Sequence, residues 1–239
     1  MISFKTGASS EYIDGFHNVF GDNYDFINKI IGVSGNVFEI YDDGAFCGGL
    51  CVFDISLKVY NEIKTGAYIY GAFILESKRG CGYFKLLLDH VSDFYANEFY
   101  DFVLTIPAKS ELFSLYEHLG FTDTAYGVIS VLGEETKLSL PSDTAIEAFD
   151  GDFFRLYFMH VENDGILKIF DLFKCSVEDF EIKYISHGQS EGYALFDNGK
   201  LIFASADFAN YEKKKKGLIK KLTAFDVPND FLCDVLFEA

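Results

Sequence analysis

Apolar residues recur along the chain with two periods, and each period predicts one kind of element. A spacing of three or four residues is typical of a helix with one buried face. It predicts helices at residues 10–20, 24–31, 83–99 and 111–119. Shorter apolar runs between glycines and turn residues predict strands. These runs lie at residues 37–41, 45–53, 67–75, 101–106, 126–132, 180–186, 193–196 and 201–206.

The stretch Gly133-Glu134-Glu135, followed by Pro141, is the best candidate for a domain boundary and divides residues 1–135 from residues 136–239. The second part adds a helix-like segment at 152–161 and a short segment at 166–174 to its strands. Six lysines fall within residues 213–221, which favours the solvated face of a helix. The pattern predicts an α/β (α+β) protein with a smaller C-terminal α+β region.

Composition narrows the class of protein. The 239 residues carry a net charge of −17 and are 49% hydrophobic, with 27 Phe and 15 Tyr. This charge argues against nucleic acid as a partner, because phosphate binding needs clustered Lys and Arg, and it favours a cationic substrate. Neither a signal peptide nor a membrane-spanning run is evident. Five cysteines do not make a disulfide framework, so we expect a reduced, soluble, cytoplasmic protein.

The strongest candidate for chemistry is the segment SKRGCGYF, which lies between a predicted buried strand and a predicted helix. A glycine turn lets backbone N–H groups approach an anion, and the helix that follows adds its positive N-terminal dipole. Lys78, Arg79 and Lys85 also make this a locally basic spot. The segment matches neither a Walker loop nor a complete Rossmann fingerprint. A glycine turn between a strand and a helix can also exist without any ligand.

Two segments together resemble the GNAT (GCN5-related) N-acetyltransferase family. ILESKRGCGYFKLLLDHV is similar to its acetyl-CoA-binding segment, with Arg79, Gly80 and Gly82 at the positions of the family's R/Q-x-x-G-x-G/A motif. About thirty residues later, LFSLYEHLGF is similar to the end of the family's second signature helix. The resemblance covers residues 1–135 and implies a mixed, mainly antiparallel sheet flanked by helices. By analogy, the C-terminal region would be a partial repeat of that fold.

The resemblance also implies roles for particular residues. The backbone amides of one run would hold the pyrophosphate of acetyl-CoA: Arg79, Gly80, Cys81, Gly82, Tyr83 and Phe84. The end of the preceding strand, near Phe73 and Ile74, would bind the pantetheine arm and polarise the thioester. Tyr116 falls on the family's tyrosine and would protonate the departing thiolate as a general acid. The alternative for Tyr116 is a tyrosine that simply packs within a helix.

Three departures from the family pattern bear on cofactor binding. Phe84 replaces the last Gly or Ala of the loop and could crowd the pyrophosphate, and Glu76 replaces a proline and brings a negative charge. Lys109 replaces an asparagine and could reach a phosphate oxygen. No catalytic base stands out: the strand at 67–75 holds no carboxylate, which leaves Tyr68, Tyr70 or a water for that role.

Other motifs point to other classes of protein. Residues 188–192 fit the G-x-S-x-G pattern of hydrolases, but a hairpin rather than a helix is predicted after the serine, and no histidine follows it. Cys47 and Cys51 lie on a predicted strand without a companion cluster of metal ligands, so we expect no metal.

We therefore expect an enzyme that moves an acetyl group from acetyl-CoA to a primary amine by direct attack in a ternary complex. A small molecule is favoured over a protein as the acceptor, and neither nucleic acid nor membrane is expected as a partner. The C-terminal region would either cap the acceptor cleft or form a homodimer. The competing hypothesis is a non-catalytic GNAT-like module that binds an acyl-CoA or a partner.

Overall fold

The computed structural model describes residues 1–60, 62–132, 140–149, 166–168, 180–204, 214–227 and 230–238. The four helices predicted within residues 1–135 are confirmed, together with one 3₁₀ turn. They are α1 (Ser10–Phe20), α2 (Tyr24–Val33), η1 (Glu76–Lys78), α3 (Tyr83–Asn97) and α4 (Glu111–His118). Within the part of the chain that is described, none of these helices is long and apolar enough to cross a membrane.

The first two helices begin at residues that cap them. The side chain of Ser9 accepts a hydrogen bond from the backbone N–H of Tyr12, and Asn23 does the same for Phe26. Such caps satisfy N–H groups that have no partner within the helix. Gly21 ends α1 at a φ of 82°, a left-handed conformation that glycine adopts without strain.

A large sheet of nine strands forms the body of the protein. Its order is β1-β2-β3-β4-β5-β12-β6-β13-β8. The strands are β1 (Ile2–Thr6), β2 (Asn36–Asp42), β3 (Ala45–Val59), β4 (Glu62–Ile74), β5 (Phe102–Thr105), β6 (Asp123–Leu132), β8 (Ile166–Lys168), β12 (Lys214–Lys221) and β13 (Asp230–Glu238). Most neighbours are antiparallel, while β4–β5, β6–β13 and β13–β8 are parallel. Because β8 also pairs with β3, the seven strands from β3 to β8 form a closed ring.

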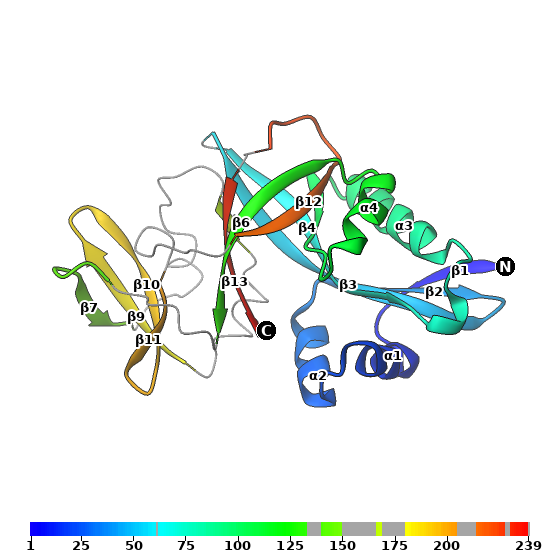
Figure 1. Cartoon of the computed structure of the whole chain (residues 1–239), viewed down its shortest axis with the longest axis horizontal. Helices are drawn as coiled ribbons and strands as arrows, with labels where there is room; N and C mark the ends of the chain where they lie inside the picture. Colours follow the sequence, from blue (N-terminus) through cyan, green and yellow to red (C-terminus); the bar gives the residue numbers. More distant parts are fainter. Residues whose placement is uncertain are drawn as a thin grey trace.

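The helices cover the two faces of this sheet. Figure 1 shows α1 and α2 below β1–β3, and α3 and α4 above them. One core cluster lies under α1 and α2 and contains Tyr12, Phe16 and Ile27. The other lies under α3 and α4 and contains Leu87 and Tyr116. The sheet is therefore buried on both sides, which explains why its central strands read as nearly continuous apolar runs.

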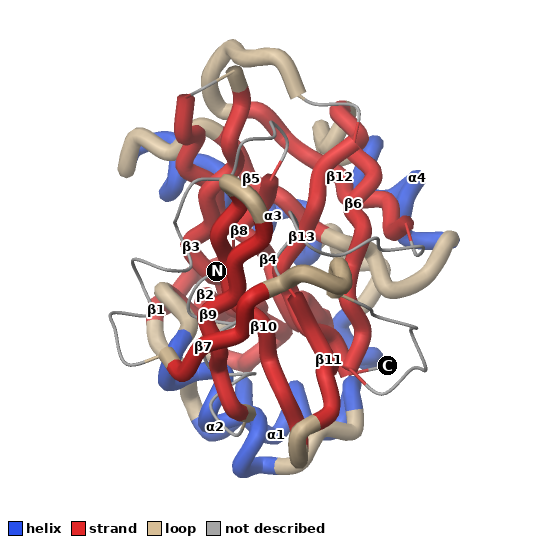
Figure 2. Tube along the Cα trace, turned by 90° about the vertical axis from the view of Figure 1, so that its left-hand side faces the viewer, coloured by secondary structure: helices blue, strands red, loops and turns tan. Residues whose placement is uncertain are grey.

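A second, four-stranded sheet has the order β11-β10-β9-β7. Its strands are β7 (Ala145–Ala148), β9 (Glu181–His187), β10 (Ser190–Asp197) and β11 (Lys200–Ala204). Figure 2 looks onto this sheet, with the large sheet behind it. Its small core centres on Ile185, Ala194 and Ala204. The predicted helix-like segment at 152–161 lies outside the described residues.

Strand β12 changes the division of the chain that the sequence suggested. It lies between β5 and β6, and β13 follows on the other side of β6, so both strands belong to the large sheet although they come after residue 135. The predicted helix over the lysine run was wrong, because Lys214–Lys221 forms β12. The strand is anchored by Leu218 and Ile219, which are fully buried in the clusters on opposite faces.

Candidate functional site

The two central strands of the large sheet separate part of the way along. Strand β4 pairs with β5 only from Gly66 to Ile69, opposite Phe102–Thr105, although β4 continues to Ile74. A bulge lies just beyond this point, where the register against β3 shifts and Gly71 takes a φ of 58°. Bulges bend the strand that carries them. Residues 71–74 of β4 therefore lie beyond the pairing with β5; we call this stretch the open edge of β4.

The backbone of Ile74 points toward the open edge. The N–H of Leu75 donates to the carbonyl of Cys47 on β3, at 2.9 Å. Since successive residues of a strand direct their N–H and C=O groups to opposite sides, the groups of Phe73 face β3 and those of Ile74 face away from it. The Nε of Arg79 donates to the Ile74 carbonyl at 3.2 Å. Of the two strand residues predicted to bind pantetheine, Ile74 has its amide on the open edge, whereas Phe73 contributes a buried ring.

The loop after β4 ends in a helix N-terminus that has no side-chain cap. Gly80 and Gly82 have φ values of 77° and 80°, and a Cβ added at either would meet nothing within 4 Å. Gly82 is the N-cap of α3 and provides no side-chain hydrogen bond, in contrast to the caps of α1 and α2. The first N–H groups of a helix have no partner within the helix and carry a partial positive charge. This glycine loop can therefore accept an anion through its backbone.

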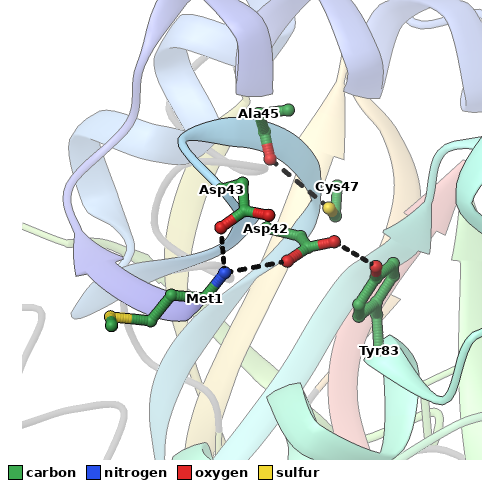
Figure 3. Close-up of polar contacts among 6 residues, drawn as sticks. All are labelled: Met1, Asp42, Asp43, Ala45, Cys47 and Tyr83. Atoms are coloured by element: carbon green, nitrogen blue, oxygen red, sulfur yellow. Dashed lines mark hydrogen bonds and ion pairs between the residues drawn. The ribbon is translucent and has the colours of Figure 1, made fainter.

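A contact distant in sequence holds the first residue of α3 in place. The hydroxyl of Tyr83 donates to Oδ2 of Asp42, at the end of β2, at 2.7 Å (Figure 3). This hydrogen bond raises the pKa of Tyr83 to about 12 and lowers the pKa of Asp42. The Met1 amine also contacts Asp42 (3.4 Å) and Asp43. This contact could not be predicted from the sequence pattern, because Tyr83 and Asp42 are 41 residues apart.

Tyr116 lies where β4 and β5 diverge. Its side chain is 5% exposed, and its hydroxyl is hydrogen bonded to Thr105, the residue of β5 that pairs with Ile69 at the end of the shared register. Burial raises the pKa of the Tyr116 hydroxyl above that of an ordinary tyrosine, which is itself protonated at neutral pH. The ring of Phe84 packs edge-on against the Tyr116 ring at 5.6 Å. Thr105 is a site residue that sequence reasoning missed.

The other predicted site residues lie at the surface. Cys81 is exposed, and its Sγ is 3.7 Å from the carbonyl of Arg79. Lys109 is exposed just before α4, and its carbonyl accepts the N–H of Leu112 at 3.1 Å. Lys85, on the first turn of α3, forms an ion pair with Asp89. The described residues contain no group of three or more metal-ligating side chains.

The hydrolase-like pattern lies on a hairpin, as expected from the residues that follow it. Ser190 begins β10 and pairs with His187 of β9. A nucleophile elbow needs a helix after the serine, and here a strand follows.

No protein-family model matches the sequence, and none of the curated proteins searched is similar to it. Solved structures are similar in fold. A GCN5-related N-acetyltransferase from Anabaena variabilis superposes with a TM-score of 0.61 at 13% identity, over 92% of this chain and 73% of that one. One from Kribbella flavida gives 0.58 at 13% identity, over 92% and 72%. A probable N-acyltransferase from Enterococcus faecalis gives 0.58 at 11% identity, over 82% of this chain and 55% of that one.

The chain thus spans nearly three quarters of the length of the first two proteins and little more than half of the third. At these identities the likeness concerns the fold. It agrees with the resemblance carried by the SKRGCGYF and LFSLYEHLGF segments. The chain has the fold of the GCN5-related N-acetyltransferases.

Proposed function

We propose that this protein transfers an acetyl group from acetyl-CoA to a primary amine, with both substrates bound together. The observation that carries the proposal is the juxtaposition of three features. The glycine loop with its uncapped helix N-terminus directly follows the open edge of β4, and the buried Tyr116 hydroxyl is hydrogen bonded to Thr105, where the pairing of β4 with β5 ends and a gap between the two strands begins.

Acetyl-CoA fits these features. Its pyrophosphate would be held by the backbone N–H groups at the start of α3, where Gly80 and Gly82 leave room for a close approach. Its pantetheine arm would lie along the open edge, where the N–H of Ile74 can donate a hydrogen bond. Lys78 and Lys109 would add positive charge near the phosphates. Acetyl-CoA supplies an acetyl group already activated as a thioester.

The protein then has two tasks during transfer. A backbone N–H aimed at the thioester oxygen stabilises the negative charge that develops there as the amine attacks. The Tyr116 hydroxyl gives its proton to the sulfur as the C–S bond breaks, so that CoA leaves as a thiol. The proton on the attacking nitrogen leaves to solvent. Tyrosine carries its proton at neutral pH, and burial raises the pKa of Tyr116 further, so the donor enters the reaction in its protonated form.

The competing hypothesis is a module that binds an acyl-CoA or a partner without turnover, and it depends on Phe84 closing the loop. The contact between Phe84 and Tyr116 directs the Phe84 ring into the core cluster under α3 and α4. A Cβ added at Gly80 or Gly82 would meet nothing within 4 Å outside the adjacent residues. Both observations favour a loop that is open to phosphate.

The test is to incubate the protein with acetyl-CoA and a panel of primary amines and to follow both CoA and N-acetylated amine by chromatography. We expect the two products to form in equal amounts. Binding of acetyl-CoA without amine-dependent release of CoA would favour the binding module instead.

A further inference from the structure

The acceptor must approach the open edge of β4 from the face covered by α1 and α2. If the proposed function holds, CoA occupies the face of the β4–β5 gap that α3 and α4 cover, because the glycine loop and Tyr116 both lie with the core cluster on that face. The nitrogen lone pair must reach the thioester carbon beside the CoA arm. The route left to it is the opposite face, next to the side chains of Tyr70 and Phe73 on β4.

That face carries a group of rings in mutual contact, which we call the aromatic wall: Phe16, Phe20, Tyr70 and Phe73. Phe16 lies 4.7 Å from Phe20 and 6.3 Å from Tyr70, and Phe20 lies 6.2 Å from Phe73, measured between ring centroids. Phe16 and Phe73 are buried, whereas Phe20 is 44% exposed. The wall therefore runs from solvent at the end of α1 to the buried side of the open edge.

Acidic groups lie on the surface around this wall, not in it. Asp14 and Asp25 lie on the exposed faces of α1 and α2, and Asp14 accepts a hydrogen bond from the half-exposed Tyr24 at 3.1 Å. The buried carboxylate on the same face, Glu39, has both oxygens engaged, by the N–H of Ser9 and the hydroxyl of Tyr41, each at 2.6 Å. Among the described residues, Glu39 is the only buried carboxylate, so no second one is available to pair with a buried ammonium.

We infer that the acceptor is a small aromatic primary amine, whose ring packs against the half-exposed Phe20 at the solvent end of the aromatic wall while its nitrogen reaches the open edge of β4. An acidic surface attracts the protonated amine from solution. Aromatic surroundings then favour its neutral, nucleophilic form, because burial disfavours the charged form. A polyamine would instead need a line of carboxylates to balance its charges. The aromatic wall supplies ring contacts, and the proton that the ammonium loses before attack passes to solvent at the exposed end of the wall, beside Phe20.

The inference is tested with three amines: 2-phenylethylamine, its saturated analogue 2-cyclohexylethylamine, which differs from it only in aromaticity, and the polyamine spermidine. Ring-to-ring contacts are worth roughly 2- to 13-fold in affinity. We expect kcat/KM for 2-phenylethylamine to exceed that for the cyclohexyl analogue by a factor in this range, and that for spermidine by more.

A matched pair of variants locates the effect. Phe20→Ala removes a half-exposed ring of the wall, and Phe99→Ala removes a ring that is 91% exposed after the end of α3. We expect Phe20→Ala to raise KM for 2-phenylethylamine roughly 5-fold, with KM for acetyl-CoA unchanged. Phe99→Ala should leave both constants as they are.

The outcomes separate this inference from the proposed function. If acetyl-CoA binds and spermidine is the better acceptor, or if both variants behave alike, the aromatic acceptor is overturned and acetyl transfer stands. If acetyl-CoA does not bind at all, both are overturned.

Discussion

Gly82 offers the sharpest test of the glycine loop. It is the N-cap of α3, its φ is 80°, and an added Cβ would meet nothing within 4 Å. Gly21 is its match on the opposite face of the sheet: it has a φ of 82° and equally open surroundings. Gly82→Ala and Gly21→Ala therefore impose the same backbone strain, but only the first places a methyl group where the pyrophosphate would approach.

The cost to folding should be similar in the two variants. A left-handed conformation costs an alanine about 1–2 kcal/mol, and no clash adds to it because the space is open. For a protein of this size, each kcal/mol lowers Tm by roughly 2–4 °C. The affinity for acetyl-CoA should distinguish Gly82→Ala from Gly21→Ala. Losing one hydrogen bond to a charged phosphate costs roughly 1.5–3 kcal/mol, which corresponds to a loss of at least about 10-fold in affinity.

The assay is thermal unfolding with and without acetyl-CoA. At about 100 times its Kd, the ligand should stabilise the parent and Gly21→Ala by about 2.7 kcal/mol. At the same concentration, a 10-fold weaker Gly82→Ala should gain only about 1.4 kcal/mol. Equal stabilisation of the two variants by acetyl-CoA would refute the assignment of the anion site to the N-terminus of α3.

Three further changes test other parts of the account. Tyr116→Phe should lower kcat about 100-fold or more without changing the Kd of acetyl-CoA. The control Tyr95→Phe removes another buried hydroxyl and should leave kcat unchanged. If the two variants had equal kcat values, Tyr116 could not be the general acid. Ser9→Ala should cost about 1 kcal/mol in denaturant unfolding, because the N–H of Tyr12 loses its cap; an unchanged midpoint would contradict this. Burial against Phe4 lowers the pKa of His90 in the folded protein, so the unfolded chain binds a proton at this imidazole more readily. The free energy of unfolding should therefore fall as the pH drops below about 6.5. His90→Phe should flatten this pH dependence.

The local elements of the site could be predicted from the sequence because neighbouring residues determine them. The glycine turn and the helix after it depend on residues within one short segment, as does the helix that carries Tyr116. These elements formed where the pattern placed them. The order of the sheet depends on distant pairing, and β12 escaped notice because only Gly217, Leu218 and Ile219 separate its lysines.

The lysines of β12 are accommodated by contacts that the sequence does not reveal. The Nζ of Lys216 lies 3.4 Å from a carboxylate oxygen of Glu117 on α4, and Lys220 lies 3.9 Å from Asp89 on α3. A run of lysines usually indicates a solvated helix because isolated charges are costly to bury. The partners of Lys216 and Lys220 come from the helices that cover the strand, whereas Lys221 forms an ion pair with Asp123 of the neighbouring strand β6, at 3.1 Å.

The side-chain contacts that complete the candidate site could not be predicted from the sequence either. The pairs Tyr116–Thr105 and Tyr83–Asp42 join different elements, and the aromatic wall joins α1 to β4. The high aromatic content predicts contacts between rings, but composition does not indicate where in the fold these contacts lie. Only the fold places them beside the open edge of β4.

The central claim is acetyl transfer, and the most direct measurement is the amine-dependent release of CoA. Chromatographic detection avoids the exposed thiol of Cys81, which would react with a colorimetric thiol reagent. With 2-phenylethylamine as acceptor, the account predicts CoA and N-acetylated amine in equal amounts, at a rate that falls sharply in Tyr116→Phe. If acetyl-CoA binds but no amine accelerates the release of CoA, the protein is not an N-acetyltransferase and the account is wrong.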